Sequence, residues 1–363
     1  MKTNAAKLYL RRFGASLLLM LLALHISAQS KGNTSAQGLK DVFAKDFLVG
    51  VSLSGRNVRI EAEQELIRKE FNSVTCENAM KPASLHPAPG VWRWDEADRI
   101  ADFCRQNGIK MRGHCLVWHN QFADWMFSDD KGNPVSKETF YERLRDHIHT
   151  VMRRYADVVY AWDVVNEAMS DGGENPYRQS RLYRLCGDEF IAKAFRFARE
   201  ADPKALLFYN DYNETNPRKA RNIYEMVLRM RSEGVPIDGI GMQGHYNIYG
   251  PSVEELEAAL RLYAPLVEHI HVTELDVRAS EEMGGQLQFD RQGVEMSDTI
   301  QELLARQYER LFKTFRRFRD KIDCVTFWNL HDGCSWLGEK NHPLLFDKAL
   351  QPKPAYYRIT ADK

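Results

Sequence analysis

The sequence has few cysteines and no excess of charge of either sign. Six cysteines occur among 363 residues, none in a C-x-x-C spacing, so neither a disulfide-stapled scaffold nor a structural zinc site is indicated. If one pair forms a disulfide, Cys324 and Cys334 are favoured, because they flank one short segment. Fifty Lys and Arg residues balance fifty Asp and Glu residues, which excludes a nucleic-acid binder held by bulk positive charge.

Long hydrophobic runs are also absent, apart from one near the N-terminus. Four basic residues precede the apolar run Ala15–Ile26, which is short for a membrane span, and small residues follow it. This order predicts a secretory signal peptide over residues 1–28, cleaved after Ala28. An uncleaved membrane anchor is the alternative, and it is disfavoured because no stop-transfer pattern follows.

Export has consequences for the rest of the chain. Cleavage removes four positive charges and no negative ones, which leaves the mature protein at a net charge of −4. We expect a secreted or periplasmic protein that does not associate with membranes after cleavage. Nothing in the sequence indicates an oligomer, so a monomer is expected. Residues 29–40 are polar and rich in small residues, and they are expected to form a mobile leader.

Beyond residue 40, short apolar runs alternate with longer amphipathic stretches. Helical spacing of apolar residues is clear at 187–200 and 298–318. Strands are predicted at Leu48–Leu53, Ser73–Cys76, Met111–Trp118, Val158–Val165, Leu206–Tyr209, Gly239–His245, Ile270–Leu275 and Cys324–Leu330. Eight strands alternating with helices predict an α/β fold, a (β/α)8 TIM barrel formed by residues 41–363 as a single domain. A doubly wound open sheet is the alternative. The non-periodic stretch 279–296 is expected to form an extended loop after the seventh strand.

Polar and aromatic residues gather where these strands end. Acids, amides and indoles follow the strands in the segments 77–81, 118–119, 166–167, 210–213, 243–246 and 274–276, and two tryptophans bracket the end of the eighth strand. In a parallel barrel all these ends open onto the same face, where active sites lie. The sequence therefore predicts a catalytic or binding site on that face.

Two glutamates at these strand ends are suited to two different catalytic roles, general acid and nucleophile. Glu167 follows a largely apolar strand, so partial desolvation favours its protonated form and suits a general acid. Glu274 follows the seventh strand, and a second acid kept ionised by hydrogen bonds suits a nucleophile. Hydrolysis of a glycosidic bond requires this pair of roles.

The segments around both glutamates resemble known motifs. Trp162–Glu167 (WDVVNE) and Val272–Asp276 (VTELD) are similar to the acid/base and nucleophile motifs of glycoside hydrolase family 10, the retaining endo-β-1,4-xylanases. Further matches occur in family order at Glu77–Lys81, 113–119, Asn210–Asn213, Gln243–His245 and Pro352–Tyr356. The resemblance covers essentially the whole mature chain and implies hydrolysis of xylan with retention through a covalent glycosyl-enzyme intermediate.

The resemblance also implies roles for individual residues. Glu167 would be the acid/base and Glu274 the nucleophile, while Asn166 would bind the 2-hydroxyl of the sugar under attack. His245 would orient Glu274, and Asp276 would orient His245. Substrate-binding roles are implied for Glu77, Asn78, Lys81, His114, Trp118, His119, Tyr212, Gln243, Trp328 and Trp336. Trp92, Trp94, Trp125 and Trp162 are interpreted as packing residues.

Some positions depart from the family pattern, and other functions stay open. Asn329 follows Trp328 where the family usually has glycine, and a side chain there is expected to alter the pose of Trp328 or the room around the first subsites. The same retaining mechanism on another β-1,4-glycan, such as cellulose or mannan, is one alternative. A non-catalytic saccharide-binding relative is another, and the presence of both glutamates weakens it.

No cofactor or catalytic metal is expected. Residues 239–244 spell G-x-G-x-x-G, but no helix follows them to complete a pyrophosphate site. His114 and His119 do not form a helical His-Glu-x-x-His arrangement, so we predict that no metal takes part in catalysis. A structural calcium ion in the aspartate-rich loops stays open.

Overall fold

The computed structural model describes residues 37–280 and 293–361, and the structural statements below concern those residues. The predicted signal peptide, most of the polar leader and most of the loop at 279–296 lie outside them. Leu39 and Lys40, which the sequence analysis assigned to the leader, form the start of helix α2 (Leu39–Val42). Leu39 is fully buried and its backbone N–H donates to Glu70 at 2.8 Å, so these residues belong with the folded domain.

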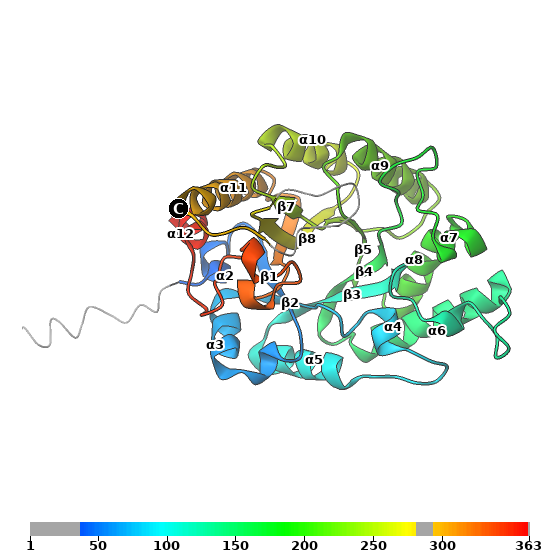
Figure 1. Ribbon diagram of the computed structural model, residues 1–363. Coiled ribbons are helices and arrows are strands. Elements are labelled where there is room, and N and C mark those ends of the chain that lie inside the picture. The colour runs from blue at the N-terminus through cyan, green and yellow to red at the C-terminus, as the bar shows by residue number, and fades with distance from the viewer. Residues whose placement is uncertain (1–36, 281–292, 362–363) are drawn as a thin grey trace, which may run out of the picture. The chain divides into compact units, whose positions relative to one another are not determined.

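Eight parallel strands form a closed barrel at the centre of the molecule (Figure 1). They are β1 (Leu48–Leu53), β2 (Ser73–Cys76), β3 (Lys110–Trp118), β4 (Val159–Asn166), β5 (Leu206–Asp211), β6 (Gly239–Met242), β8 (His269–Arg278) and β9 (Ile322–Phe327). Successive strands are neighbours, β6 pairs with β8, and β9 pairs with β1 to close the sheet. The predicted (β/α)8 barrel is therefore confirmed, and the open doubly wound sheet is excluded.

The sixth predicted strand is shorter than the sequence suggested. Residues 239–245 were predicted as one strand, but β6 ends at Met242 and a short strand β7 (His245–Asn247) follows. Gly244 lies between them with φ of +78°, a left-handed conformation that glycine adopts without steric cost. β7 pairs with the far end of β8, in register His245 with Asp276. The turn thus places His245 beside the strand that carries Glu274.

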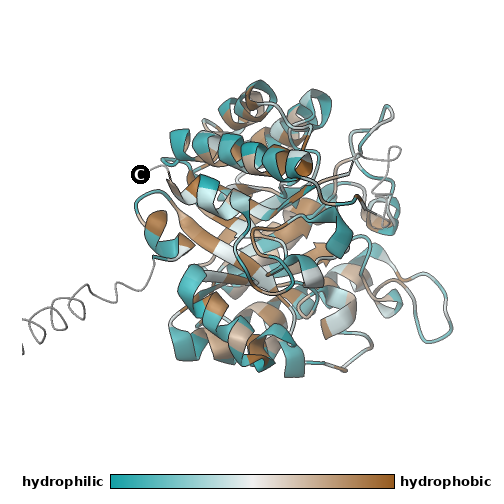
Figure 2. Cartoon of the chain, turned by 60° about the vertical axis from the view of Figure 1, so that its left-hand side comes forward, coloured by the Kyte–Doolittle hydropathy of each residue, from teal (hydrophilic) through white to brown (hydrophobic). Residues whose placement is uncertain are grey.

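Helices surround the barrel and pack their apolar faces against it. The longer ones are α3 (Glu61–Glu70), α5 (Asp95–Asn107), α6 (Lys137–Arg154), α8 (Glu189–Ala201), α9 (Pro217–Ser232), α10 (Val253–Tyr263), α11 (Asp298–Arg317) and α12 (Pro354–Ala361). Short helices are α4 (Pro82–Leu85), α7 (Arg181–Cys186), η1 (Asn57–Arg59), η2 (Asp124–Met126), η3 (Asp332–Cys334) and η4 (Glu339–Asn341). Figure 2 shows hydrophobic strands inside and mixed helices outside. On α8, for example, Phe190, Ile191, Ala194, Phe195 and Ala198 are buried at helical spacing.

All six cysteines are free, so the pairing favoured by sequence spacing is wrong. Cys324 is buried in β9 beside the Thr326 hydroxyl, while the thiol of Cys334 donates to the His331 carbonyl at 3.2 Å. Within the described residues, the helices are all too short or too polar to cross a bilayer.

Candidate active site

A cavity of about 470 Å³ opens at the carboxyl ends of the barrel strands. It is lined by Glu77, Asn78, Lys81, His114, Trp118, Asn120, Gln121, Asn166, Glu167, Gln243, His245, Glu274, Trp328 and Trp336. A second hollow of about 580 Å³ lies between α3 and α5 and holds none of the predicted site residues. The candidate active site is therefore the cavity at the strand ends, where both glutamates meet.

Strand register brings the central polar groups to one level. Trp118 on β3 is in register with Asn166 on β4, which is in register with Asn210 on β5. The Asn210 amide donates to Oδ1 of Asn166 and to Oε1 of Glu274, each at 2.8 Å. One buried amide thus links the residue that precedes Glu167 with Glu274 across the barrel.

Glu274 is held as an ionised carboxylate. It is buried, and burial alone would raise its pKa. The charges of His114, His245 and Lys81 and the hydrogen bond from His245 outweigh burial and lower the pKa to about 2. A desolvated carboxylate that stays charged at neutral pH can attack an electrophilic carbon.

His245 lies between two carboxylates. Its Nε2 is 3.3 Å from Oε2 of Glu274, and its Nδ1 is 3.0 Å from Oδ2 of Asp276. Burial disfavours the charged ring, but the charge and hydrogen bond of Asp276, with those of Glu274, raise the pKa of His245 to about 10. His245 is therefore an imidazolium that donates from both nitrogens. Asp276 also accepts from the Trp336 indole at 2.8 Å, which fixes that ring over the cavity.

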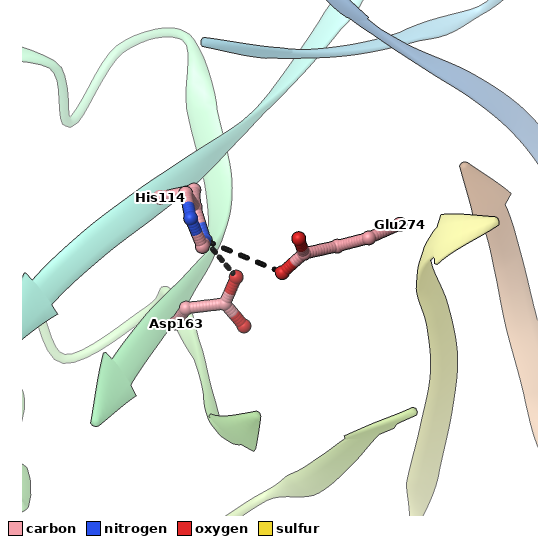
Figure 3. A group of neighbouring side chains, drawn as sticks. All are labelled: His114, Asp163 and Glu274. Atoms are coloured by element: carbon pink, nitrogen blue, oxygen red, sulfur yellow. Dashed lines mark hydrogen bonds and ion pairs between the residues drawn. The ribbon is translucent and has the colours of Figure 1, made fainter. Parts of the chain in front are cut away.

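A second histidine approaches Glu274 from the opposite side. His114 Nδ1 lies 2.9 Å from Oδ2 of Asp163 and 3.9 Å from Oε1 of Glu274 (Figure 3). The Arg112 guanidinium, fully buried beneath them, binds both oxygens of Asp163. These three residues form a buried charge network under the nucleophile.

His114, Asp163 and Glu274 also place three possible metal ligands within 4.8 Å of one another. Their donor atoms are already engaged: Arg112 binds Asp163, and Asn210 and His245 bind Glu274. A cation here would have to displace these partners, so the donor set fits a charge network better than a metal centre.

Glu167 is held from both sides of its carboxyl group. Oε1 accepts from Gln243 at 3.0 Å and from Asn166 at 3.2 Å, while Oε2 accepts from the Trp118 indole at 2.9 Å. Its backbone has φ of +58°, a left-handed conformation that costs a residue other than glycine about 1–3 kcal/mol. The surrounding structure must therefore hold this turn in place.

Comparison with known proteins identifies the chain. The family model described as glycosyl hydrolase family 10 matches residues 38–362. The chain belongs to glycosyl hydrolase family 10.

Named relatives of this family 10 chain agree with that assignment. An endo-1,4-beta-xylanase/feruloyl esterase of Xylanibacter ruminicola is 57% identical over 87% of this chain, which spans only 45% of that protein. Endo-1,4-beta-xylanase B of Paenibacillus barcinonensis is 43% identical over 90% of this chain and 98% of its own length. A psychrophilic family 10 endo-beta-1,4-xylanase of known structure aligns with a TM-score of 0.86 and 52% identity, covering 90% of this chain and 99% of that one.

The side of the family 10 cavity formed by β2 and β3 carries charge and aromatic surface together. Lys81 donates to Asn78 at 3.0 Å and lies 4.7 Å from the Trp118 ring centre. Burial raises the pKa of Glu77, partly offset by its hydrogen bond to Asn329 and by the charge of Lys81. Indole faces beside such polar groups suit pyranose rings, which present apolar faces and hydroxyl edges.

Asn329, the departure from the family pattern, braces this side. Its φ is +88°, in the region that favours the glycine usual at this position, and it is buried. Its Oδ1 accepts from the Trp336 backbone at 3.0 Å, and its side chain hydrogen-bonds Glu77. Asn329 therefore ties a cavity tryptophan to a cavity carboxylate without lining the cavity itself.

The structure gathers most of the predicted residues, but not all of them. His119 and Tyr212 do not line the cavity, and Asp276 lies behind His245. The Tyr212 hydroxyl instead donates to Asp171 and accepts from Arg178, while burial lowers the pKa of His119 to about 4. Trp162 is fully buried, and Trp92 and Trp94 stack on each other, as expected for packing residues.

Sequence reasoning missed three polar residues that contribute to the site. Asn120 and Gln121 line the cavity just after β3, and Asn210 connects the two catalytic strands. Asn210 stood in a family motif, at a strand end level with Asn166, so register between neighbouring strands could have indicated it.

Proposed function

We propose that this chain is an endo-acting β-1,4-xylanase that hydrolyses the xylan backbone with retention of anomeric configuration. The observation that carries the proposal is the unequal treatment of two carboxyl groups in one cavity. Glu274 is kept ionised by nearby positive charge and by the hydrogen bond from His245, while Glu167 accepts hydrogen bonds from the uncharged Gln243, Asn166 and Trp118. The names of the family 10 relatives favour xylan over cellulose or mannan as the substrate.

In the first step, Glu274 attacks the anomeric carbon of the bound xylose unit. The glycosidic C–O bond breaks, and Glu167 transfers its proton to the departing oxygen. The product is a sugar ester of Glu274 and a shortened chain with a free hydroxyl. His245 stabilises the carboxylate before the attack and holds its second oxygen in position throughout.

In the second step, Glu167 acts as a base. It takes a proton from a water molecule, whose oxygen attacks the anomeric carbon and displaces Glu274. Two inversions give net retention, and Glu167 ends the cycle protonated. Asn166, held by Asn210 and Gln243, is positioned to bind the 2-hydroxyl of the reacting sugar.

The substrate is tested by measuring the release of reducing ends from xylan, carboxymethyl-cellulose and mannan under identical conditions. We expect xylan to be cleaved fastest, with mixed oligosaccharides early in the reaction, as internal cleavage requires. Faster cleavage of either other polymer would overturn the xylan assignment but keep the mechanism. Saccharide binding without cleavage of any polymer would indicate a binding protein.

We also propose that the protein acts outside the cytoplasm as a monomer. The basic and apolar pattern of residues 1–28 supports export, and a polymeric substrate would have to be met outside the cell or in the periplasm. N-terminal sequencing of the exported protein, together with light scattering, tests both points.

A further inference from the structure

The backbone around Glu167 is hydrogen-bonded through both its N–H groups and its carbonyl groups. The Tyr209 hydroxyl accepts from the backbone N–H of Ala168 at 3.1 Å and of Met169 at 3.0 Å. It also donates to Asp211. Tyr209 is fully buried on β5 and does not line the cavity, so it acts on the backbone of the acid/base turn rather than on a ligand.

Asp211 is in turn held by a buried lysine. Lys219 on α9 is 2% exposed, and its Nζ lies 2.9 Å from Asp211 and 2.7 Å from Asp171. The pair of Lys219 with Asp211 is a fixed anchor, because both side chains are buried and breaking the pair would leave Asp211 as an uncompensated buried charge. Lys219 on α9 thus holds Asp211, and Asp211 in turn holds the Tyr209 hydroxyl.

Arg178 holds the same turn through its carbonyl groups. Its Nε donates to the Glu167 carbonyl at 3.0 Å, and a terminal nitrogen lies 3.3 Å from the Met169 carbonyl. Its own backbone N–H donates to the Ala168 carbonyl at 2.8 Å. The backbone N–H of Glu167 donates to the backbone carbonyl of Asn210 at 2.9 Å, so the peptide groups of residues 167–169 are all hydrogen-bonded.

We propose that Tyr209, Asp211, Lys219 and Arg178 form a backbone clamp that positions the Glu167 carboxyl for its two proton transfers. The proposal rests on the proposed function, in which Glu167 is the acid/base. A turn with positive φ relaxes when its hydrogen bonds are lost, and a small displacement of the carboxyl group lengthens the path of the proton. The clamp residues are positioning residues, because none of them lines the cavity. Arg178 and Tyr209 contact the backbone of residues 167–169, and Asp211 and Lys219 hold the Tyr209 hydroxyl in place.

Tyr209→Phe tests the clamp, because it removes one hydroxyl and keeps the ring in the core. The substrates are two aryl β-xylobiosides, one releasing phenol and the other 2,4-dinitrophenolate, which departs without acid assistance. We expect kcat/KM for the phenyl substrate to fall about 10- to 100-fold, and that for the dinitrophenyl substrate to change less than about threefold. On the dinitrophenyl substrate kcat should fall, because hydrolysis of the intermediate needs the base. Added azide should restore kcat, because this anion attacks the intermediate without having to lose a proton to a base.

Tyr155→Phe is the matched control. Tyr155 is a fully buried tyrosine whose hydroxyl donates to a carboxylate, Asp98, at 2.9 Å, but it lies away from the cavity. A comparable loss of thermal stability in the control, with the rate ratio of the two substrates unchanged, would separate positioning from general destabilisation. Arg178→Lys, which removes the Nε donor to Glu167, should reproduce the leaving-group dependence of Tyr209→Phe.

The outcomes are distinguishable. If kcat/KM in Tyr209→Phe and Arg178→Lys fell equally for both substrates, or did not fall for either, the clamp would be overturned while the proposed function stands. A wild-type protein that cleaves neither aryl xylobioside would overturn the proposed function and the clamp together.

Discussion

At the scale of single residues, the account depends on two carboxyl groups made unequal by their neighbours. Glu274 has an imidazolium on one oxygen and an amide on the other, whereas Glu167 is bound by amides and an indole. The nucleophile needs a negative charge, which the positive neighbours of Glu274 stabilise. Changing a single neighbour should therefore affect one glutamate more than the other.

Glu167→Gln should reduce xylan hydrolysis by about two to four powers of ten, because both proton transfers are lost while the size of the side chain is kept. Rates of reducing-end release measure the effect. Glu70→Gln is the control, since Glu70 is also buried but lies near α2, away from the cavity. Unchanged turnover in Glu167→Gln would remove Glu167 from the mechanism.

His245→Asn should move the acid limb of activity upward. The imidazolium lowers the pKa of Glu274, so its loss raises that pKa, and the nucleophile becomes protonated at a higher pH. We expect the acid limb of kcat/KM for dinitrophenyl xylobioside to rise by roughly one pH unit or more. Circular dichroism at each pH confirms that the fold is retained. An acid limb at the wild-type position would show that His245 does not control the charge of Glu274.

At the scale of elements, the sequence predicted strands well wherever the apolar run and the strand coincide. The predicted ranges of β1 and β2 are those observed. β2 is bounded by the polar residues Asn72 and Glu77, and β1 ends before Ser54. The break between β6 and β7 was not predicted, although Gln243 and Gly244 interrupt the apolar run, because the positive φ of Gly244 that turns the chain is visible only in the tertiary structure.

The charged residues inside the strands were not predicted to belong to the site. Arg112 lies in β3 among apolar residues, and its partner Asp163 comes from the next strand. A charged residue within an apolar strand can be recognised in the sequence as unusual. Its partner depends on the register between neighbouring strands, which the sequence of a single strand does not specify. His119 and Tyr212 show the reverse case. Their motif positions suggested substrate contact, but neither residue lines the cavity, and the Tyr212 hydroxyl is hydrogen-bonded to Asp171 and Arg178.

The junction of α4 with α6 should make stability depend on acid pH. Nδ1 of His86, at the end of α4, lies 3.2 Å from Nδ1 of His147 on α6. Burial lowers their pKa values to about 4 and about 3. Because the folded state has the lower pKa, the unfolded state binds more protons, and stability is lost as the pH falls from about 6.5 toward 3.

His147→Asn should therefore flatten the dependence of unfolding free energy on pH between about 6.5 and 3, by an amount on the order of a few kcal/mol. Urea unfolding at a series of pH values measures it. A slope as steep as that of the wild-type protein would assign the acid sensitivity to other groups.

At the scale of the whole molecule, the barrel explains why residues distant in sequence share one chemistry. Each strand contributes its carboxyl end to the same cavity, and eight strands closed in parallel leave one such face. The fold class and the pair of glutamates were predictable because both follow from the order of strands and strand-end residues. The hydrogen bonds that hold the turn after Glu167 were not, since they join side chains from β5, α9 and the segment after β4.

The central claim is that Glu274 forms a covalent bond to the sugar while Glu167 moves the protons. The most direct measurement uses 2,4-dinitrophenyl 2-deoxy-2-fluoro-β-xylobioside, whose fluorine slows hydrolysis of the intermediate so that it accumulates. Mass spectrometry of the intact protein and of its peptides should show one fluoroxylobiosyl group, attached to Glu274. An active enzyme that gains no mass, or a label on Glu167 or any other residue, would contradict the account.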